Sequence, residues 1–133
     1  MNFEGSITFS IVDVADFDEN INEKIGFEPT KITKKGELIT TKQKAQFNIW
    51  RYEVKFNDLT FTAALSDFNN QLAIFRKNIT DISCEYERVE INLYVHTLFG
   101  QFGFSIPNEE LVKLSSLGID VDFHFLSFGD VEN

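Results

Sequence analysis

Residues 88–128 read RVEINLYVHTLFGQFGFSIPNEELVKLSSLGIDVDFHFLSF, and this stretch decides the expected fold. Apolar and polar residues alternate in three segments, which is the two-residue period of half-buried strands. Gly100 breaks the first run. Between the second and third runs the leucines recur every three residues, as on one face of a helix that Gly118 closes. The predicted elements are strands over 88–97, 101–106 and 119–127 and a helix over 109–117.

The first two thirds of the chain contain the same two periods. Asp16, with Glu19 three residues later, is typical of a helix start, and Gly26 is typical of a helix end. Further along, apolar residues spaced four and three apart form one continuous stripe, which indicates a single long helix. The predicted elements are strands over 4–14 and 47–56 and helices over 16–25 and 61–79.

From residue 47 onward the elements follow the order βαββαβ, which is that of a ferredoxin-like fold. Right-handed crossovers place both helices of this unit on one face of the sheet. We therefore expect a single α+β domain over residues 1–133, with a mostly antiparallel sheet and helices on one face. The extra βα unit at the N-terminus is expected to extend one edge of the sheet. A functional site is expected on the opposite, polar face.

Residues 31–46 are the least patterned part of the chain. They contain five lysines against one glutamate, a net charge of +4. These lysines are Lys31, Lys34, Lys35, Lys42 and Lys44. Long, charged connections are typically either mobile or functional. Two interpretations stay open: a mobile solvent loop, or a loop that binds an anionic ligand.

The net charge of −9 is unevenly distributed. Residues 1–66 have 8 Lys and Arg against 10 Asp and Glu, a net of −2, whereas residues 67–133 have 4 against 11, a net of −7. An acidic surface repels phosphate backbones, so we expect no nucleic-acid binding. It suits a basic protein partner, which the field would steer towards the surface. The alternative is that the charge only keeps the protein in solution.

Composition also bears on the compartment. No run approaches the roughly 18–20 apolar residues of a membrane span, and Met1–Glu4 is not followed by the apolar run of a secretory signal. The one cysteine, Cys84, excludes an internal disulfide. We therefore expect a cytoplasmic protein without membrane association, either a monomer or a homodimer. The 15 phenylalanines are expected in the core or at an interface, because their rings have no polar atom.

Candidate chemistry is sparse. Asp120, Asp122 and His124 alternate on one strand, and carboxylates with an imidazole are common ligands of divalent metals. Along a strand these positions span about 13 Å at roughly 3.3 Å per residue, which is too far for one ion. The sequence also has neither of the glycine-rich phosphate-binding motifs. We therefore expect no metal, no cofactor and no catalytic residues.

Two groups of residues carry a family resemblance. The first is Gly26–Thr30, followed by Lys35–Gly36 and Trp50, and the second is Phe104–Pro107, followed by the leucines and alternating residues of 111–123. Together they resemble a bacterial family known as domain of unknown function 4279. The similarity covers about residues 5–127, and the family implies no catalytic residues. In size and acidity the chain also resembles the cytoplasmic immunity proteins that neutralise toxins in bacterial competition, which is an analogy of class because fold does not fix function.

The sequence thus favours a non-enzymatic protein-binding module, most concretely an immunity-type inhibitor of a basic toxin domain. The acidic residues expected to bind the partner are Glu85, Glu87, Glu90, Asp120 and Asp122. The alternative is a small-ligand or metal-binding domain, or an enzyme, that uses the lysine-rich loop 31–44. The residues expected to bind a ligand in that case are Lys31, Lys34, Lys35, Trp50 and Arg51.

Overall fold

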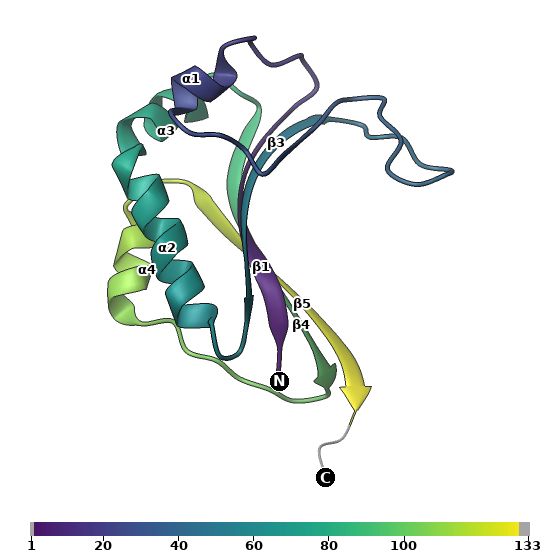
Figure 1. Ribbon diagram of the computed structural model, residues 1–133, viewed down its shortest axis with the longest axis vertical. Coiled ribbons are helices and arrows are strands. Elements are labelled where there is room, and N and C mark those ends of the chain that lie inside the picture. Colours follow the sequence, from purple (N-terminus) through teal and green to yellow (C-terminus); the bar gives the residue numbers. More distant parts are fainter. Residues whose placement is uncertain (1, 131–133) are drawn as a thin grey trace.

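A five-stranded sheet forms the centre of the molecule (Figure 1), for which a computed structural model describes residues 2–130. The strands are β1 (Glu4–Asp13), β2 (Lys31–Thr33), β3 (Asn48–Asn57), β4 (Arg88–Phe99) and β5 (Asp120–Asp130). Their order in space is β2-β3-β1-β4-β5. All neighbours pair antiparallel except β4 and β5, which are parallel. The expected α+β class with a mostly antiparallel sheet is therefore confirmed.

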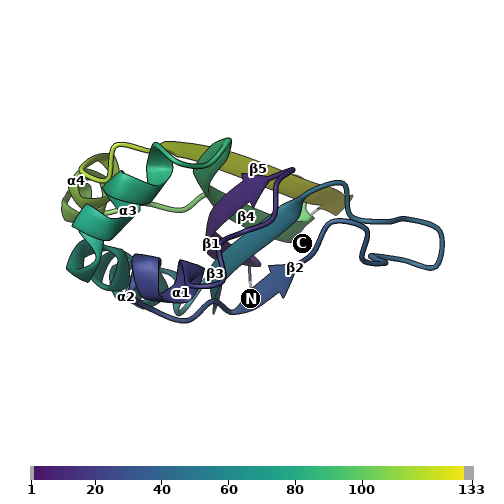
Figure 2. The same cartoon turned by 90° about the horizontal axis from the view of Figure 1, so that it is seen from above.

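Four helices cover one face of this sheet, as Figures 1 and 2 show from two directions. They are α1 (Ile21–Ile25), α2 (Phe61–Ile74), α3 (Arg76–Ser83) and α4 (Asn108–Ser115). The right-handed connection rule for parallel neighbours accounts for α4, which joins β4 to β5. The result is a two-layer structure, with the other face of the sheet free of helices over the described residues.

The core lies between the helices and the sheet. It is formed by the apolar members of the alternating strands and by the helix stripes, and its largest fully buried side chains include Trp50, Phe9, Phe68 and Leu72. The indole Nε1 of Trp50 donates a hydrogen bond to Oδ1 of Asn22, 2.8 Å away, so the polar atom of this buried ring is satisfied.

The position of the first strand differs from the expectation. β1 was expected at an edge, yet it lies in the middle, where Ile7 pairs with Val54 on one side and Leu93 on the other. Its run of six buried residues, Ile7–Val12, is typical of a strand with neighbours on both sides. This central first strand and the parallel β4/β5 pair mean that the ferredoxin-like arrangement is not confirmed.

Residues 101–106 were expected to be a strand, but they form no ladder. Phe102 and Phe104 instead pack their rings against Phe3 and Phe125, with ring centroids 5.5–6.2 Å apart. The alternation in this segment therefore reflects aromatic side chains that face the core from an irregular chain. Backbone pairing is not needed to produce it.

The expected long helix over 61–79 is two helices. The chain breaks at Phe75, whose backbone dihedrals (φ −107°, ψ 21°) separate α2 from α3. The Phe75 ring packs on Phe27 with centroids 5.1 Å apart, and it also covers Gly26. The break thus fits a contact with the end of α1, which the periodicity of the helix alone does not show.

Candidate functional site

The face of the sheet without helices is concave. In Figure 1 the central strand β1 curves away from the helices at both ends, so that the face of the sheet without helices lies on the inside of its curve. The pairing registers place the side chains of this face in rows across the strands. One row consists of Lys31, Arg51, Ser10, Glu90 and Asp120. We call this surface the open face.

Small hydroxyl residues of β1 form the floor of the open face. Thr8 and Ser10 are only 2% and 5% exposed, although no helix covers this side of the sheet in the described chain. Their burial follows from the longer side chains of β3 and β4, which stand on both sides of them. The Thr8 hydroxyl lies 3.5 Å from the carbonyl oxygen of Asn92 on the neighbouring strand. The centre of the face is therefore a strip of small polar residues flanked by longer side chains, which we call the trough.

The β4/β5 side of the trough is acidic. Glu90 lies in register with Asp120, and Asn92 lies in register with Asp122, so three carboxylates gather on two neighbouring strands. Arg88 offsets part of this charge, with its Nε 3.4 Å from Glu90 Oε2. Asp120 and Asp122 have no ion-pair partner among the described residues. Three of the five acidic residues that the sequence singled out thus lie together.

Asn92 connects this acidic side to the aromatic residues beside it. Its amide nitrogen lies 3.3 Å from Glu90 Oε1, and its Oδ1 lies 2.9 Å from Nε2 of His124. Because Oδ1 can only accept, Nε2 of His124 carries the proton in this contact. The imidazole also stacks on the Tyr94 ring, with centroids 4.6 Å apart. Hydrogen-bonding groups and a flat ring surface therefore adjoin the carboxylates.

The other two predicted acidic residues lie elsewhere. Glu85 approaches Lys24 of α1, with 3.6 Å between its Oε2 and the Nζ, so it faces the helical side. The backbone amide of Glu87 donates to Asp13 Oδ2 at 2.9 Å. The amides of Ala15 and Glu87 stabilise the ionised form of Asp13 and lower the pKa of that carboxyl. Both glutamates belong to the segment between α3 and β4 and not to the trough.

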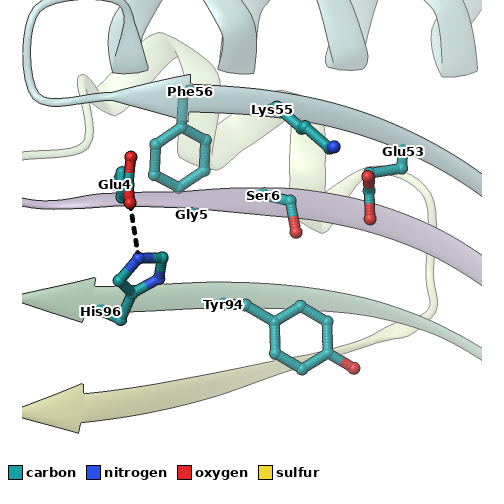
Figure 3. A pocket seen from close by; sticks show the side chains of 8 residues that line it. All are labelled: Glu4, Gly5, Ser6, Glu53, Lys55, Phe56, Tyr94 and His96. Atoms are coloured by element: carbon teal, nitrogen blue, oxygen red, sulfur yellow. Dashed lines mark hydrogen bonds and ion pairs between the residues drawn. The ribbon is translucent and has the colours of Figure 1, made fainter.

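A recess lies at the other end of the open face, and Figure 3 shows the side chains around it. It has a volume of about 370 Å³. Its lining residues are Glu4, Gly5, Ser6, Glu53, Lys55, Phe56, Tyr94 and His96. Nε2 of His96 lies 2.8 Å from Glu4 Oε1. Burial raises the pKa of the Tyr94 phenol, so this hydroxyl stays protonated at neutral pH and can donate a hydrogen bond.

Sequence reasoning did not single out the recess. The alternation places Lys55, Glu53 and Tyr94 on polar strand faces, but their approach depends on β1 lying between β3 and β4. That strand order was the part of the fold that the sequence did not predict. No local signal marks the recess in the sequence, because the longer side chains beside Ser6 belong to the neighbouring strands.

The lysine-rich segment forms an arm with internal backbone hydrogen bonds. Residues 34–45 form an irregular hairpin that projects away from the sheet in Figures 1 and 2. Backbone hydrogen bonds of 2.8 Å join Gly36 to Ala45, Ala45 to Glu37 and Ile39 to Gln43. The arm also places two apolar side chains in solvent, those of Leu38 and Ile39.

The residues of the alternative ligand site are divided between two sides of the sheet. Lys31 and Arg51 are register partners on the open face. Lys34 and Lys35 lie at the base of the arm, where the Lys35 amide donates to Asn48 Oδ1 at 2.7 Å. Trp50 is 0% exposed and belongs to the core on the other side of β3. The indole is therefore not accessible to a ligand that comes from solvent.

Among residues 2–130, no three His, Cys, Asp or Glu side chains lie close enough to hold one metal ion. Over the same residues no helix has the length and apolar character needed to cross a membrane.

These observations define an α+β domain whose mixed sheet carries helices on one face and, on the other, a polar surface that is acidic on its β4/β5 side. The chain belongs to the family described as Domain of unknown function (DUF4279), whose model matches residues 3–127. The resemblance that the sequence motifs indicate is thereby confirmed. No curated protein and no solved structure matches the chain.

Proposed function

We propose that this chain is a non-enzymatic protein-binding module, most concretely an acidic immunity-type inhibitor that neutralises a basic bacterial toxin. The observation that supports the proposal is the cluster of Glu90, Asp120 and Asp122 on the concave open face. A curved acidic surface fits the convex, basic region of a protein that binds nucleic acid or another polyanion. Asp120 and Asp122 are exposed, so lysine and arginine side chains of a partner can reach them from solvent.

The arrangement suits charge-assisted binding. Carboxylates accept stronger hydrogen bonds from lysine and arginine than neutral groups do, and a bidentate arginine contact also fixes orientation. The Tyr94 and His124 rings beside the carboxylates offer a flat surface on which a guanidinium can stack. In addition, the net charge of −9 attracts a basic partner at long range, which mainly increases the association rate.

The variant Asp120→Lys/Asp122→Lys is expected to bind the partner at least tenfold more weakly, because two favourable charges become repulsive at about 1 kcal/mol or more each. The dependence of affinity on salt should also flatten. The measurement is a pull-down from host lysate at low and high salt, followed by titration of the recovered basic protein against both chains.

A matched control is Asp67→Lys/Asp81→Lys, which makes the same change in net charge at exposed positions on α2 and α3. If net charge alone matters, both double variants will weaken binding equally. Equal affinity of wild type and the Asp120/Asp122 variant would show that the partner does not bind at this part of the open face.

A second candidate function, binding of a small zwitterionic molecule, is favoured by the recess of Figure 3. Lys55 offers a cation for a carboxylate group, while Glu53 and Glu4 offer acceptors for an amine. The volume of about 370 Å³ lies in the range of small-molecule sites.

This second function predicts thermal stabilisation by one member of a panel of amino acids and related zwitterions. At one hundred times the dissociation constant a ligand adds about 2.7 kcal/mol to the free energy of unfolding. Lys55→Ala should abolish the shift in melting temperature, whereas Lys31→Ala, a lysine of the same face outside the recess, should leave it intact. Melting temperatures that do not change across the panel would exclude this use of the recess.

A further inference from the structure

The outer edge of β5 is long and carries several exposed apolar side chains beside its charged ones. β5 has 11 residues and lies at the end of the strand order, and within residues 2–130 no strand pairs with its outer side. Phe123, Phe125, Leu126 and Phe128 are 48–59% exposed. An edge strand of this length normally carries charges, proline or a covering segment, because its free amide and carbonyl groups otherwise recruit another strand. Here exposed aromatic residues accompany those free groups.

We propose that β5 pairs antiparallel with β5 of a second copy of this chain, across a two-fold axis at Phe123. The two five-stranded sheets then form one continuous ten-stranded sheet. This isologous contact closes with two copies, because the same edge is used by both. The contact shares Asp122 and His124 with the partner-binding proposal, but it is argued from the free edge of β5 and does not depend on that proposal.

The register follows from the charges on β5. In a symmetric antiparallel pair, opposite residues share a face of the sheet. With the axis at Phe123, Asp122 lies opposite His124 of the second copy, and this contact occurs twice. On the helical side, Val121 lies opposite Phe125 of the second copy, and the two Phe123 rings meet at the axis. Aromatic pairs at such positions stabilise a sheet, and like charges directly opposite each other destabilise it.

Neighbouring registers bring like charges together. With the axis at Asp122, the two Asp122 carboxylates lie opposite each other. With the axis at Phe125, Asp120 lies opposite Asp130 of the second copy. With the axis at His124, the two imidazoles meet and neither aspartate faces an imidazole. Only the register centred on Phe123 among these four pairs an aspartate with an imidazole and avoids a like-charge contact. A second copy of β5 is therefore the partner strand that best fits this edge.

The test begins with the mass of the purified chain, measured by sedimentation equilibrium over a wide concentration range. The expected result is a dimer in wild type and a monomer in Phe123→Lys, because two ammonium groups would meet at the axis. In the proposed register the two strands overlap over residues 120–126. Phe128→Lys makes the same exchange outside this overlap and should keep the dimer. A monomeric wild type at all concentrations would overturn the proposal, and so would equal loss of the dimer in both variants.

Disulfide trapping tests the register without relying on a charged variant. In a Cys84→Ser background, Phe123→Cys is expected to cross-link on mild oxidation, since opposite residues of paired strands lie within the roughly 7 Å that a disulfide requires. Phe125→Cys should remain uncrosslinked, because its two copies would lie about 13 Å apart in this register. Cross-linking at position 125 in place of 123 would overturn the register and the Asp122–His124 contacts with it.

Discussion

Replacing Gly5 with alanine is expected to lower the free energy of unfolding by about 3 kcal/mol, at the upper end of the usual cost of overpacking. A Cβ atom at this position would lie 1.8 Å from the carbonyl oxygen of Tyr94 and 2.8 Å from its carbonyl carbon. Both contacts are with backbone of the paired strand β4, so no side-chain rotation relieves them. The two central strands must separate, at the point where Gly5 pairs with Val95 and Phe56.

Thermal denaturation measures this effect, and a fall of roughly 10 °C in melting temperature is expected for a chain of this size. The matched control is Gly103→Ala, where a new Cβ atom meets no atom within 4 Å. The control should melt close to wild type. Similar melting temperatures for the Gly5 variant and wild type would mean that β1 and β4 are further apart than the structure shows.

Gly26→Ala is expected to cost a similar amount, about 3 kcal/mol, for two separate reasons. Gly26 ends α1 with φ at +105°, a backbone conformation in which an L-residue is strained by roughly 1–2 kcal/mol. An added Cβ atom would also lie 2.4 Å from the ring of Phe75, and overpacking of this kind costs about 1–3 kcal/mol.

Two further variants separate those reasons. Gly36→Ala adds a Cβ atom at a similar φ of +89° with nothing within 4 Å, so it measures the backbone strain alone, about 1 kcal/mol. Combining Gly26→Ala with Phe75→Ala should cost less than the sum of the single variants, because the clash disappears with the ring. Strict additivity in this double-mutant cycle would refute the contact between the end of α1 and the break between α2 and α3.

Local periodicity predicted most of the secondary structure, because it reports which side of a segment is buried. The strands expected over 4–14, 47–56, 88–97 and 119–127 correspond to β1, β3, β4 and β5. The same signal failed for residues 101–106, where Phe102 and Phe104 face the core without a ladder. The signal also predicted one continuous helix across Phe75. The apolar spacing shows which side of the helix is buried, but it does not show the contact with Gly26 that accompanies the break.

For the candidate site, too, the sequence predicted local features but not the pairing of distant strands. Asp120 and Asp122 were correctly placed on one polar strand face, since this requires only alternation within β5. Their proximity to Glu90 depends on β4 and β5 being parallel neighbours, and the recess depends on β1 lying between β3 and β4. Pairing between segments far apart in the chain is determined by the packing of the whole domain, which one sequence does not reveal. The burial of Trp50, in contrast, can be predicted from the sequence, because this residue alternates with the polar Arg51 along the strand.

The central position of β1 also has a consequence for how the protein is made. Both neighbours of β1 are synthesised after it, since Ile7 pairs with Val54 and with Leu93. Until β4 has been translated, the buried run Ile7–Val12 has only one neighbour available and remains an apolar edge. Strand pairs so distant in sequence also form slowly, because a long loop must close before the contact is gained. Translation of β4 is therefore the step after which the nascent chain can enclose its own first strand.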